Sequence, residues 1–275
     1  MVFALYFSSN NIYLFHMTWA HKRQLTILAI LIACGLIILA LIIVPKITKP
    51  ATCSDGRQNG TESGVDCGGI CKLYCVSDVQ PLTIQWSRAL PVTGSIYNLV
   101  AYIENPNRDA GIRSINYEFR IYDADNIFIA KREGVTYVNP NGAFVVFEGG
   151  VDVGNRPPKY TIFEFKGTSR FERVDPRALD VFLSSQDIQI ENLGTRPRLI
   201  ADIENSSIYE ISNITAVALL FDENENVVGA SSTIVESILP GSRDQVFFTW
   251  PAPFMENIVN KKIYPRTSVF EIPLR

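Results

Sequence analysis

Most of the residue types that can do chemistry lie in one short stretch, residues 53–75, which reads CSDGRQNGTESGVDCGGICKLYC. It holds four of the chain's five cysteines: Cys53, Cys67, Cys71 and Cys75. The stretch has too few apolar residues to build a core, so cross-links or a metal must hold its shape. Two disulfides are the expected solution, and four cysteines allow three pairings that the sequence does not distinguish. A tetrathiolate zinc site is the alternative, although the close C-x-x-C pairs typical of such sites are absent.

The same stretch carries oxygen ligands between its first two cysteines. Carboxylate and amide oxygens are the ligands that calcium prefers, and the glycines at positions 56, 60 and 64 allow the tight turns of a calcium loop. The alternative is a turn-rich loop whose Asp and Asn side chains cap their own backbone. The sequence therefore predicts a calcium site as the one candidate cofactor. Its ligands would be Asp55, Asn59, Glu62 and Asp66.

The rest of the chain is poor in catalytic groups. Its two histidines, His16 and His21, both precede the long apolar run, so the remainder cannot assemble a Ser–His–Asp or Cys–His site. An Asp/Glu pair, as in a carbohydrate-active enzyme, is the remaining route to catalysis. The candidate carboxylates fall in predicted hairpin turns, where turn formation commonly explains them. These are Asp123, Asp125, Asp222 and Glu223. We therefore expect a protein that is not an enzyme.

An uncharged apolar run, Leu25–Val44, predicts a transmembrane helix. About 20 helical residues span the roughly 30 Å hydrocarbon layer, and Pro45 is expected to end the helix. Met17 begins a pattern typical of an export signal, so it is a candidate true start. The lipobox-like sequence that ends at Cys34 suggests a lipoprotein as the alternative, but Gly35–Val44 stays apolar where a polar tether is expected.

Basic residues flank the apolar run on both sides and therefore do not fix its orientation. The segment after the run is long, and its clustered cysteines suit an oxidising compartment. We therefore expect a single-pass cell-membrane protein with residues 1–24 in the cytoplasm, a transmembrane segment at 25–44, and the rest outside. The formal net charge of -3 with no basic cluster predicts no binding of nucleic acid.

After residue 80 the sequence alternates in the manner of β-strands. In Ile115–Ile121 the apolar residues take every second position, which is typical of a half-buried antiparallel strand. The pattern recurs about one hundred residues later, where 97–107 is echoed by 198–207 and 119–123 by 218–222. The sequence thus predicts an all-β fold of two tandem immunoglobulin-like sandwiches, 80–175 and 176–275, after a cysteine-rich module at 45–79.

Three short motifs resemble known families. The strand ending in I-E-N-P-N resembles the water-stress and hypersensitive-response domain of late-embryogenesis-abundant proteins. The F-R-I-Y-D run resembles the F-x-L-Y-D domains of membrane-anchored bacterial proteins, and the stretch D-G-x-x-N-G-x-E-x-G-x-D-C-G-G resembles a cysteine-rich motif of extracellular bacterial proteins. The second copy departs from both sandwich signatures at Ser206 and Ala218. These resemblances imply binding or structural roles in a cell envelope.

Two further features bear on function. Asn105 and Asn205 occupy matching strand ends, where each is expected to cap a turn. Aromatic residues are numerous in the first copy, and we expect most in packing, with a binding face as the alternative. They are Trp86, Tyr97, Tyr102, Tyr117 and Tyr122. The sequence thus predicts a non-enzymatic, membrane-anchored envelope protein that binds another envelope protein or a glycan. A purely mechanical stalk or assembly subunit is the alternative.

Overall fold

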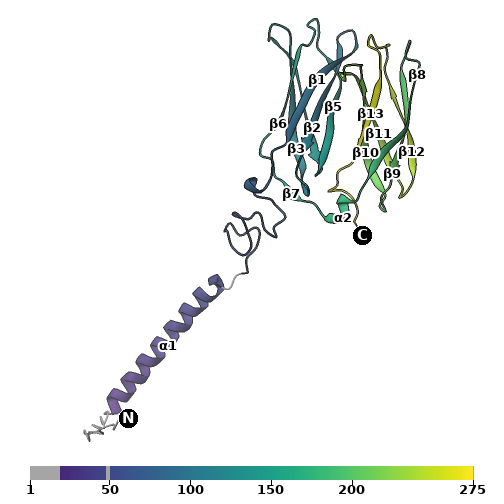
Figure 1. The fold of residues 1–275 in the computed structure, drawn as a ribbon. Coiled ribbons are helices and arrows are strands. Elements are labelled where there is room, and N and C mark those ends of the chain that lie inside the picture. Colours follow the sequence, from purple (N-terminus) through teal and green to yellow (C-terminus); the bar gives the residue numbers. More distant parts are fainter. Residues whose placement is uncertain (1–18, 48–49, 275) are drawn as a thin grey trace, which may run out of the picture. The chain divides into compact units, whose positions relative to one another are not determined.

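A computed structural model describes residues 19–47 and 50–274 of the chain, which divides into two units, Met1–Thr52 and Cys53–Arg275 (Figure 1). In the first unit, helix α1 runs from Trp19 to Ile47 and is long and apolar enough to cross a membrane. Its large apolar side chains are exposed all around the helix, which leaves them free to contact lipid. Met17 lies outside the described residues.

The expectation that Pro45 ends the helix was wrong, because α1 continues through it to Ile47. A proline removes one backbone hydrogen bond and crowds the preceding turn. With only two helical residues beyond it, the disturbance falls on the frayed last turn, where backbone bonds are few in any case.

The second unit is all-β, as predicted, apart from two single turns of helix. Seven strands follow the cysteine-rich residues and form the first sandwich, which we call sandwich 1. The elements are η1 (Val76–Asp78), β1 (Thr83–Thr93), β2 (Ile96–Asn105), β3 (Ala110–Tyr122), β4 (Phe128–Val138), β5 (Gly142–Asp152), β6 (Tyr160–Lys166) and β7 (Glu172–Arg173). One sheet has the order β1-β2-β5 and the other β4-β3-β6, with the short β7 paired to the start of β3.

The remaining strands form sandwich 2 with the same topology. Its elements are α2 (Pro176–Leu179), β8 (Leu183–Glu191), β9 (Arg198–Asn205), β10 (Ile211–Phe221), β11 (Val227–Ile238), β12 (Arg243–Thr249) and β13 (Asn260–Arg266). The sheets are β12-β9-β8 and β11-β10-β13, so β8-β9-β12 corresponds to β1-β2-β5 and β11-β10-β13 to β4-β3-β6. The internal repeat of the sequence is thus a repeat of strands and of sheet order.

Each sandwich has its own core, built from the inward residues of alternating strands. In β3, Ile115, Tyr117, Phe119 and Ile121 all point inward and are buried, as the alternation predicts. The ring of Phe119 meets that of Phe163 edge-on, with ring centroids 4.9 Å apart. In sandwich 2 the residue at the position of Phe119 is the small Ala218, and the core draws its aromatic rings from Phe248 and Trp250 instead.

A third apolar layer, which the sequence did not predict, joins the two sandwiches. Sheet β1-β2-β5 packs its outer face against the outer face of β11-β10-β13 (Figure 1). The contact buries Val100 and Val145 of sandwich 1 against Val217 and Leu219 of sandwich 2. β2 and β10 are therefore buried on both faces. Residues 53–274 thus form one block that contains four stacked sheets, rather than two sandwiches without a shared interface. In Figure 1, sheets β1-β2-β5 and β11-β10-β13 lie next to each other in the middle of the block.

Candidate binding surfaces and the cysteine-rich module

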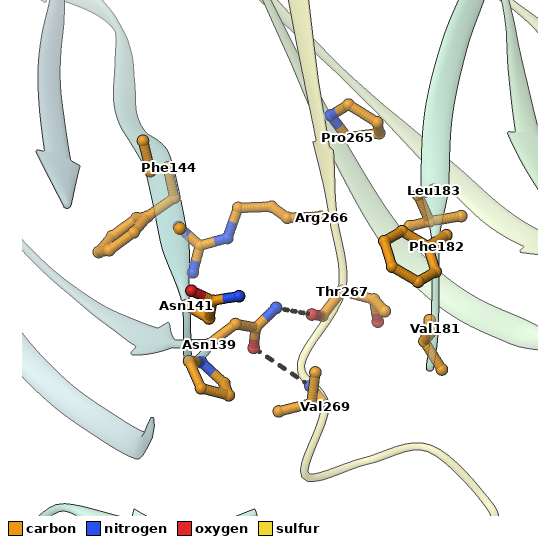
Figure 2. Close-up of a pocket in the computed structure, with 13 residues that line it drawn as sticks. Asn139, Asn141, Phe144, Val181, Phe182, Leu183, Pro265, Arg266, Thr267 and Val269 are labelled. Carbon is orange, nitrogen blue, oxygen red and sulfur yellow. Dashed lines mark hydrogen bonds between the residues drawn. The ribbon is translucent and has the colours of Figure 1, made fainter. Parts of the chain in front are cut away.

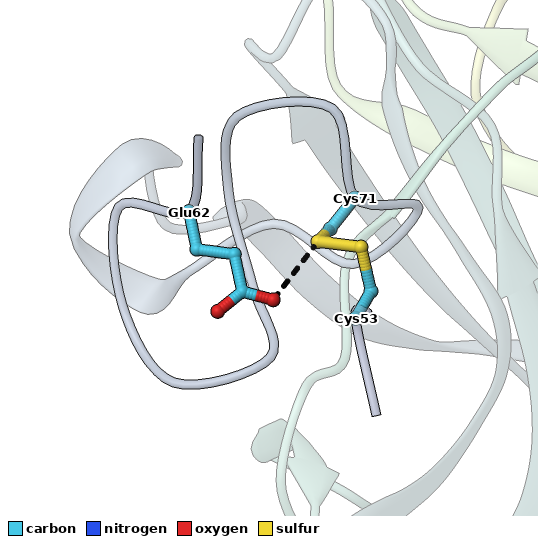
Figure 3. A group of neighbouring side chains, drawn as sticks. All are labelled: Cys53, Glu62 and Cys71. Atoms are coloured by element: carbon cyan, nitrogen blue, oxygen red, sulfur yellow. Dashed lines mark hydrogen bonds between the residues drawn. A yellow bond between two sulfur atoms is a disulfide. The ribbon is translucent and has the colours of Figure 1, made fainter. Parts of the chain in front are cut away.

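The four clustered cysteines form two disulfides, Cys53–Cys71 and Cys67–Cys75, which confirms the disulfide prediction and selects the pairing. The two bonds overlap along the chain, so each loop holds the other closed. With every one of these sulfurs oxidised, no thiolate remains for a tetrathiolate zinc site. Glu62 points toward the Cys53–Cys71 bond, and its Oε1 lies 3.5 Å from Cys71 Sγ (Figure 3). This is a contact without a shared proton, because a disulfide sulfur carries none.

The predicted calcium ligands lie together but serve the loop's own backbone. Asp66 accepts hydrogen bonds from the backbone N–H groups of Asp55 (2.9 Å) and Gly56 (3.0 Å). Asp55 accepts from the Asn59 side chain at 2.9 Å, and Glu62 accepts from the backbone N–H of Asn59 at 3.1 Å. This is the arrangement of a turn-capping loop, which explains these residue types without a cation. Calcium binding by them stays a prediction.

The cysteine-rich module is joined to sandwich 1 by backbone hydrogen bonds. The N–H of Tyr74 donates to the carbonyl of Phe171 (2.9 Å), and the N–H of Arg173 donates to that of Lys72 (2.7 Å). Residues 72–74 thereby lie beside β7, which itself pairs with β3. The carboxylate of Glu172 takes ion pairs from Lys72 and Arg113 on either side, at 2.9 and 3.3 Å. The module is therefore an extension of the sheet and not a flexible spacer.

A partly buried polar contact reinforces that joint. The Tyr74 hydroxyl donates to Asp109 at 2.6 Å, and the Arg173 guanidinium lies over the Tyr74 ring at 4.5 Å. Partial burial, with the hydrogen bond to Asp109, raises the pKa of Tyr74 to about 12. Tyr74 therefore keeps its proton and remains a hydrogen-bond donor throughout the ordinary pH range.

The two repeated asparagines hold three segments together in each sandwich. The buried side chain of Asn205 donates to the carbonyls of Tyr209 (2.7 Å) and Ile238 (2.9 Å), and its Oδ1 accepts from the backbone N–H of Ser207 (3.0 Å). Asn105 makes the equivalent bonds with Ala110, Asn139 and Asn107. The turn cap that the sequence predicts is present, and the donor bonds to two other segments were not anticipated.

The candidate catalytic carboxylates of the hairpins also cap turns. Asp123 accepts backbone hydrogen bonds from Asp125 (3.0 Å) and Ile127 (2.8 Å). Asp222 does the same for Asn224 and Asn226. The bond from Ile127, with the Arg156 guanidinium 2.6 Å away, holds the pKa of Asp123 below its usual range. The pKa of Asp222 is likewise lowered, so Asp123 and Asp222 are ionised and committed to turn geometry, which is unlike the raised pKa that a general acid needs.

A crevice of about 200 Å³ lies where the two sandwiches meet at the β4–β5 loop (Figure 2). Across it, Arg266 of β13 reaches between the rings of Tyr137 and Phe144, with its guanidinium 4.0 and 4.6 Å from their centroids. It also donates to the carbonyl oxygen of Tyr137. Asn139 donates to the carbonyl of Thr267 at 2.8 Å. Arg266 and Asn139 thus fasten sandwich 2 to sandwich 1, and the crevice is a seam rather than a ligand site.

A larger groove of about 580 Å³ lies between the cysteine-rich module and the lower end of sandwich 1. Its walls are mainly apolar and include Tyr74, Leu82, Phe165 and Phe171. Val76 at its rim is 79% exposed. The groove is a candidate for an apolar ligand, although the described residues place few polar groups in it to orient one.

A cluster of exposed aromatic side chains lies at the opposite end of sandwich 1. On the outer face of β4-β3-β6, Tyr122 is paired in register with Phe128 on one side and Tyr160 on the other. Ile162 follows two residues after Tyr160 on the same face. Phe128, Tyr160 and Ile162 are 51, 49 and 42% exposed. We call these four residues the aromatic patch.

Half of the aromatic patch has no apolar counterpart in sandwich 2, whereas Tyr122 and Phe128 correspond to Phe221 and Val227, which lie in the layer between the sandwiches. At the matching register of sandwich 2, the residues that correspond to Tyr160 and Ile162 are the polar Asn260 and Lys262. Scattered exposed apolar residues are normal on a protein surface, but contiguous ones mark contact sites. Of the aromatic residues that the sequence singled out, Tyr122 lies in this patch. Trp86 and Tyr102 stack in the layer between the sandwiches, with ring centroids 5.6 Å apart.

Comparisons with known proteins leave the function open. No protein-family model matches the chain, and no curated protein matches it. Among solved structures, a red sea bream transglutaminase covers 68% of the chain at 10% identity with a TM-score of 0.22. A beta-glucuronidase from glycoside hydrolase family 2 covers 61% at 10% identity with a TM-score of 0.21. The chain spans only 31% and 24% of those two proteins. Likeness this weak carries no argument about function.

Proposed function

We propose that this chain is a non-enzymatic, membrane-anchored protein that holds a rigid β-sandwich block outside the cytoplasm and binds an envelope partner through the aromatic patch. The observation that carries the proposal is the patch itself. Tyrosine and phenylalanine are enriched at protein interfaces and also stack on sugar rings. Three exposed apolar side chains in adjacent register cost solubility without adding to either core, so a contact role explains them best.

The block suits such a role because its parts are fixed to one another. The cysteine-rich module is paired with β7, the sandwiches share a buried layer, and Arg266 spans the seam between them. A patch on this block is therefore held in a constant orientation toward the module that follows the anchor. Rigid elements reduce the entropy that binding must offset.

Export is supported by the disulfides and by helix α1. Disulfides persist in oxidising compartments, and α1 supplies an apolar span that precedes them. Limited proteolysis of intact cells tests the orientation: added protease should release fragments of residues 53–275, while a tag at the N-terminus stays protected. Protection of both ends would contradict the outward-facing arrangement.

Site-specific photocrosslinking of the full-length chain in its native membrane tests the binding site. A photoreactive phenylalanine analogue at Phe128 should give an adduct of discrete mass, and Tyr160→Ser should weaken that adduct. Sensitivity of the adduct to protease or to glycosidase separates a protein partner from a glycan. The matched position is Val76 at the rim of the apolar groove, which is even more exposed. An adduct at Val76 and none at Phe128 would move the site to the groove and refute the patch.

A further inference from the structure

The contact between the sandwiches joins unlike faces. Sandwich 1 contributes its β1-β2-β5 face, and sandwich 2 contributes the face that corresponds to β4-β3-β6 of sandwich 1. Each sandwich therefore leaves free the face that its neighbour uses. A contact between unlike faces does not close on itself, so repetition of it would build an open stack. The stack of sheets thus has two free outer faces, one of the β1-β2-β5 type and one of the β4-β3-β6 type.

Two contacts define how the faces meet inside the chain. Asn98 of β2 donates from its side chain to the carbonyl of Ala230 on β11 at 3.0 Å. Four residues further along β2, the ring of Tyr102 meets that of Tyr264 on β13 with centroids 5.7 Å apart. Ala230 belongs to the buried layer, the other three residues are partly buried beside it, and the two contacts join the facing sheets at defined positions.

The corresponding positions on the two free faces carry like charges. Strand register places Arg198 where Asn98 stands and Lys131 where Ala230 stands, which would oppose two cations. It places Asp202 where Tyr102 stands and Glu164 where Tyr264 stands, which would oppose two carboxylates. A chain stacked on a second copy through this contact would therefore meet repulsion at both sites.

The charges on the free faces are also held in place by their own neighbours. The Arg198 guanidinium lies 4.3 Å over the Phe247 ring. On the other free face, Glu118 is only 9% exposed and lies 3.2 Å from both Arg120 and Lys166. In sandwich 2 the residues at the positions of Glu118 and Arg120 are the fully buried Val217 and Leu219. Docking an apolar sheet on this network would strip its water without supplying new partners.

We propose that the two free sheet faces are charge-blocked forms of the docking interface that joins the sandwiches. The partner that each face fits is another β-sandwich of this kind whose residues at those two positions carry the opposite charges. The like charges disfavour a second copy of this chain as that partner. The aromatic patch lies at the hairpin end of one of these two faces, the outer face of β4-β3-β6, and the argument from charge uses none of its residues.

Reversing the charges on one face tests the proposal without adding apolar surface. The full-length chain in detergent carries Arg198→Glu and Asp202→Lys, which oppose the unchanged Lys131 and Glu164 with opposite charges. Sedimentation velocity at low salt should show self-association at a concentration about tenfold below that of the wild-type chain. Adding Lys131→Glu and Glu164→Lys to the same chain restores like charges and should return it to the wild-type state. Failure of either step would overturn the proposal.

A second design transfers residues between the sandwiches. One variant carries Glu118→Val, Arg120→Leu, Lys131→Ala and Glu164→Tyr, and the other carries Arg198→Asn and Asp202→Tyr, so that each has one face closer to the internal type. Mixed together, the two should form a one-to-one complex tighter than the self-association of either. Equal association of each variant alone would indicate unspecific stickiness and would overturn the directional interface. Cooperative unfolding of each variant establishes that it is folded.

Discussion

The role of the buried asparagines leads to a prediction that separates two readings of the same residue. If Asn205 only caps its turn by accepting the N–H of Ser207, then Asn205→Asp keeps the acceptor and is tolerated. The structure instead shows its Nδ2 donating to the carbonyls of Tyr209 and Ile238. In Asn205→Asp a carboxylate oxygen replaces that donor and faces two carbonyl oxygens at a fully buried position.

The size of the effect follows from the bonds lost. Asn205→Ala removes a donor from the carbonyl groups of Tyr209 and Ile238, at about 1–3 kcal/mol each, for a total of about 2–6 kcal/mol. Asn205→Asp should cost at least as much at pH 7, because the carboxylate must also be charged in an apolar surrounding or take up a proton. The loss should therefore shrink as the pH falls toward 4 and the carboxyl group is protonated.

Urea denaturation of the full-length chain in detergent, followed by tryptophan fluorescence, measures both variants. Asp222→Asn is the matched control, because Asp222 acts as an acceptor in its turn. It accepts from the backbone N–H groups of Asn224 and Asn226 and, at 3.3 Å, from the Asn226 side chain. We expect the control to cost less than about 1 kcal/mol. Wild-type stability of Asn205→Asp at pH 7 would refute the assignment of Asn205 as a donor that joins three segments.

Three further outcomes are expected. The pKa of Asp123 is lower in the folded than in the unfolded chain, so the stability that this carboxylate contributes is complete above about pH 4 and is lost as the pH falls through the folded pKa. Asp123→Asn should therefore make the melting temperature depend less on pH in the acid range. An unchanged dependence would count against the hydrogen bonds assigned to Asp123. Arg266→Lys removes the planar group between two rings and should lower the free energy of unfolding by about 1–2 kcal/mol, seen as a lower urea midpoint. Replacing Cys53 and Cys71 by serine should open the module to protease near residues 53–75 at a cost of about 2–4 kcal/mol to the module, while the fragment from residue 80 onward stays resistant; simultaneous loss of both would show that the module is needed to hold the block.

Several features were readable from the sequence because they depend on local pattern. Three patterns predicted their structures directly: the apolar run that forms α1, the alternation in β3 and the hundred-residue repeat. The need for cross-links in the cysteine-rich stretch followed from its lack of apolar residues. In these cases the residues of a single strand, helix or turn decide which side chains are buried and which polar groups are hydrogen-bonded.

The pairing of the cysteines and the union of the two sandwiches were decided only in the tertiary structure. Which thiols meet depends on how the loop folds over, and four spacings leave that open. The runs Leu99–Ala101 and Ala216–Phe221 do carry a signal, because uninterrupted apolar residues predict a strand buried on both faces. The sequence cannot say what covers the second face, since the partner strands lie more than one hundred residues away. The buried layer forms only when those two distant faces meet in the folded chain. Because the two sandwiches repeat each other, the corresponding charged faces remain free at the two ends of the stack.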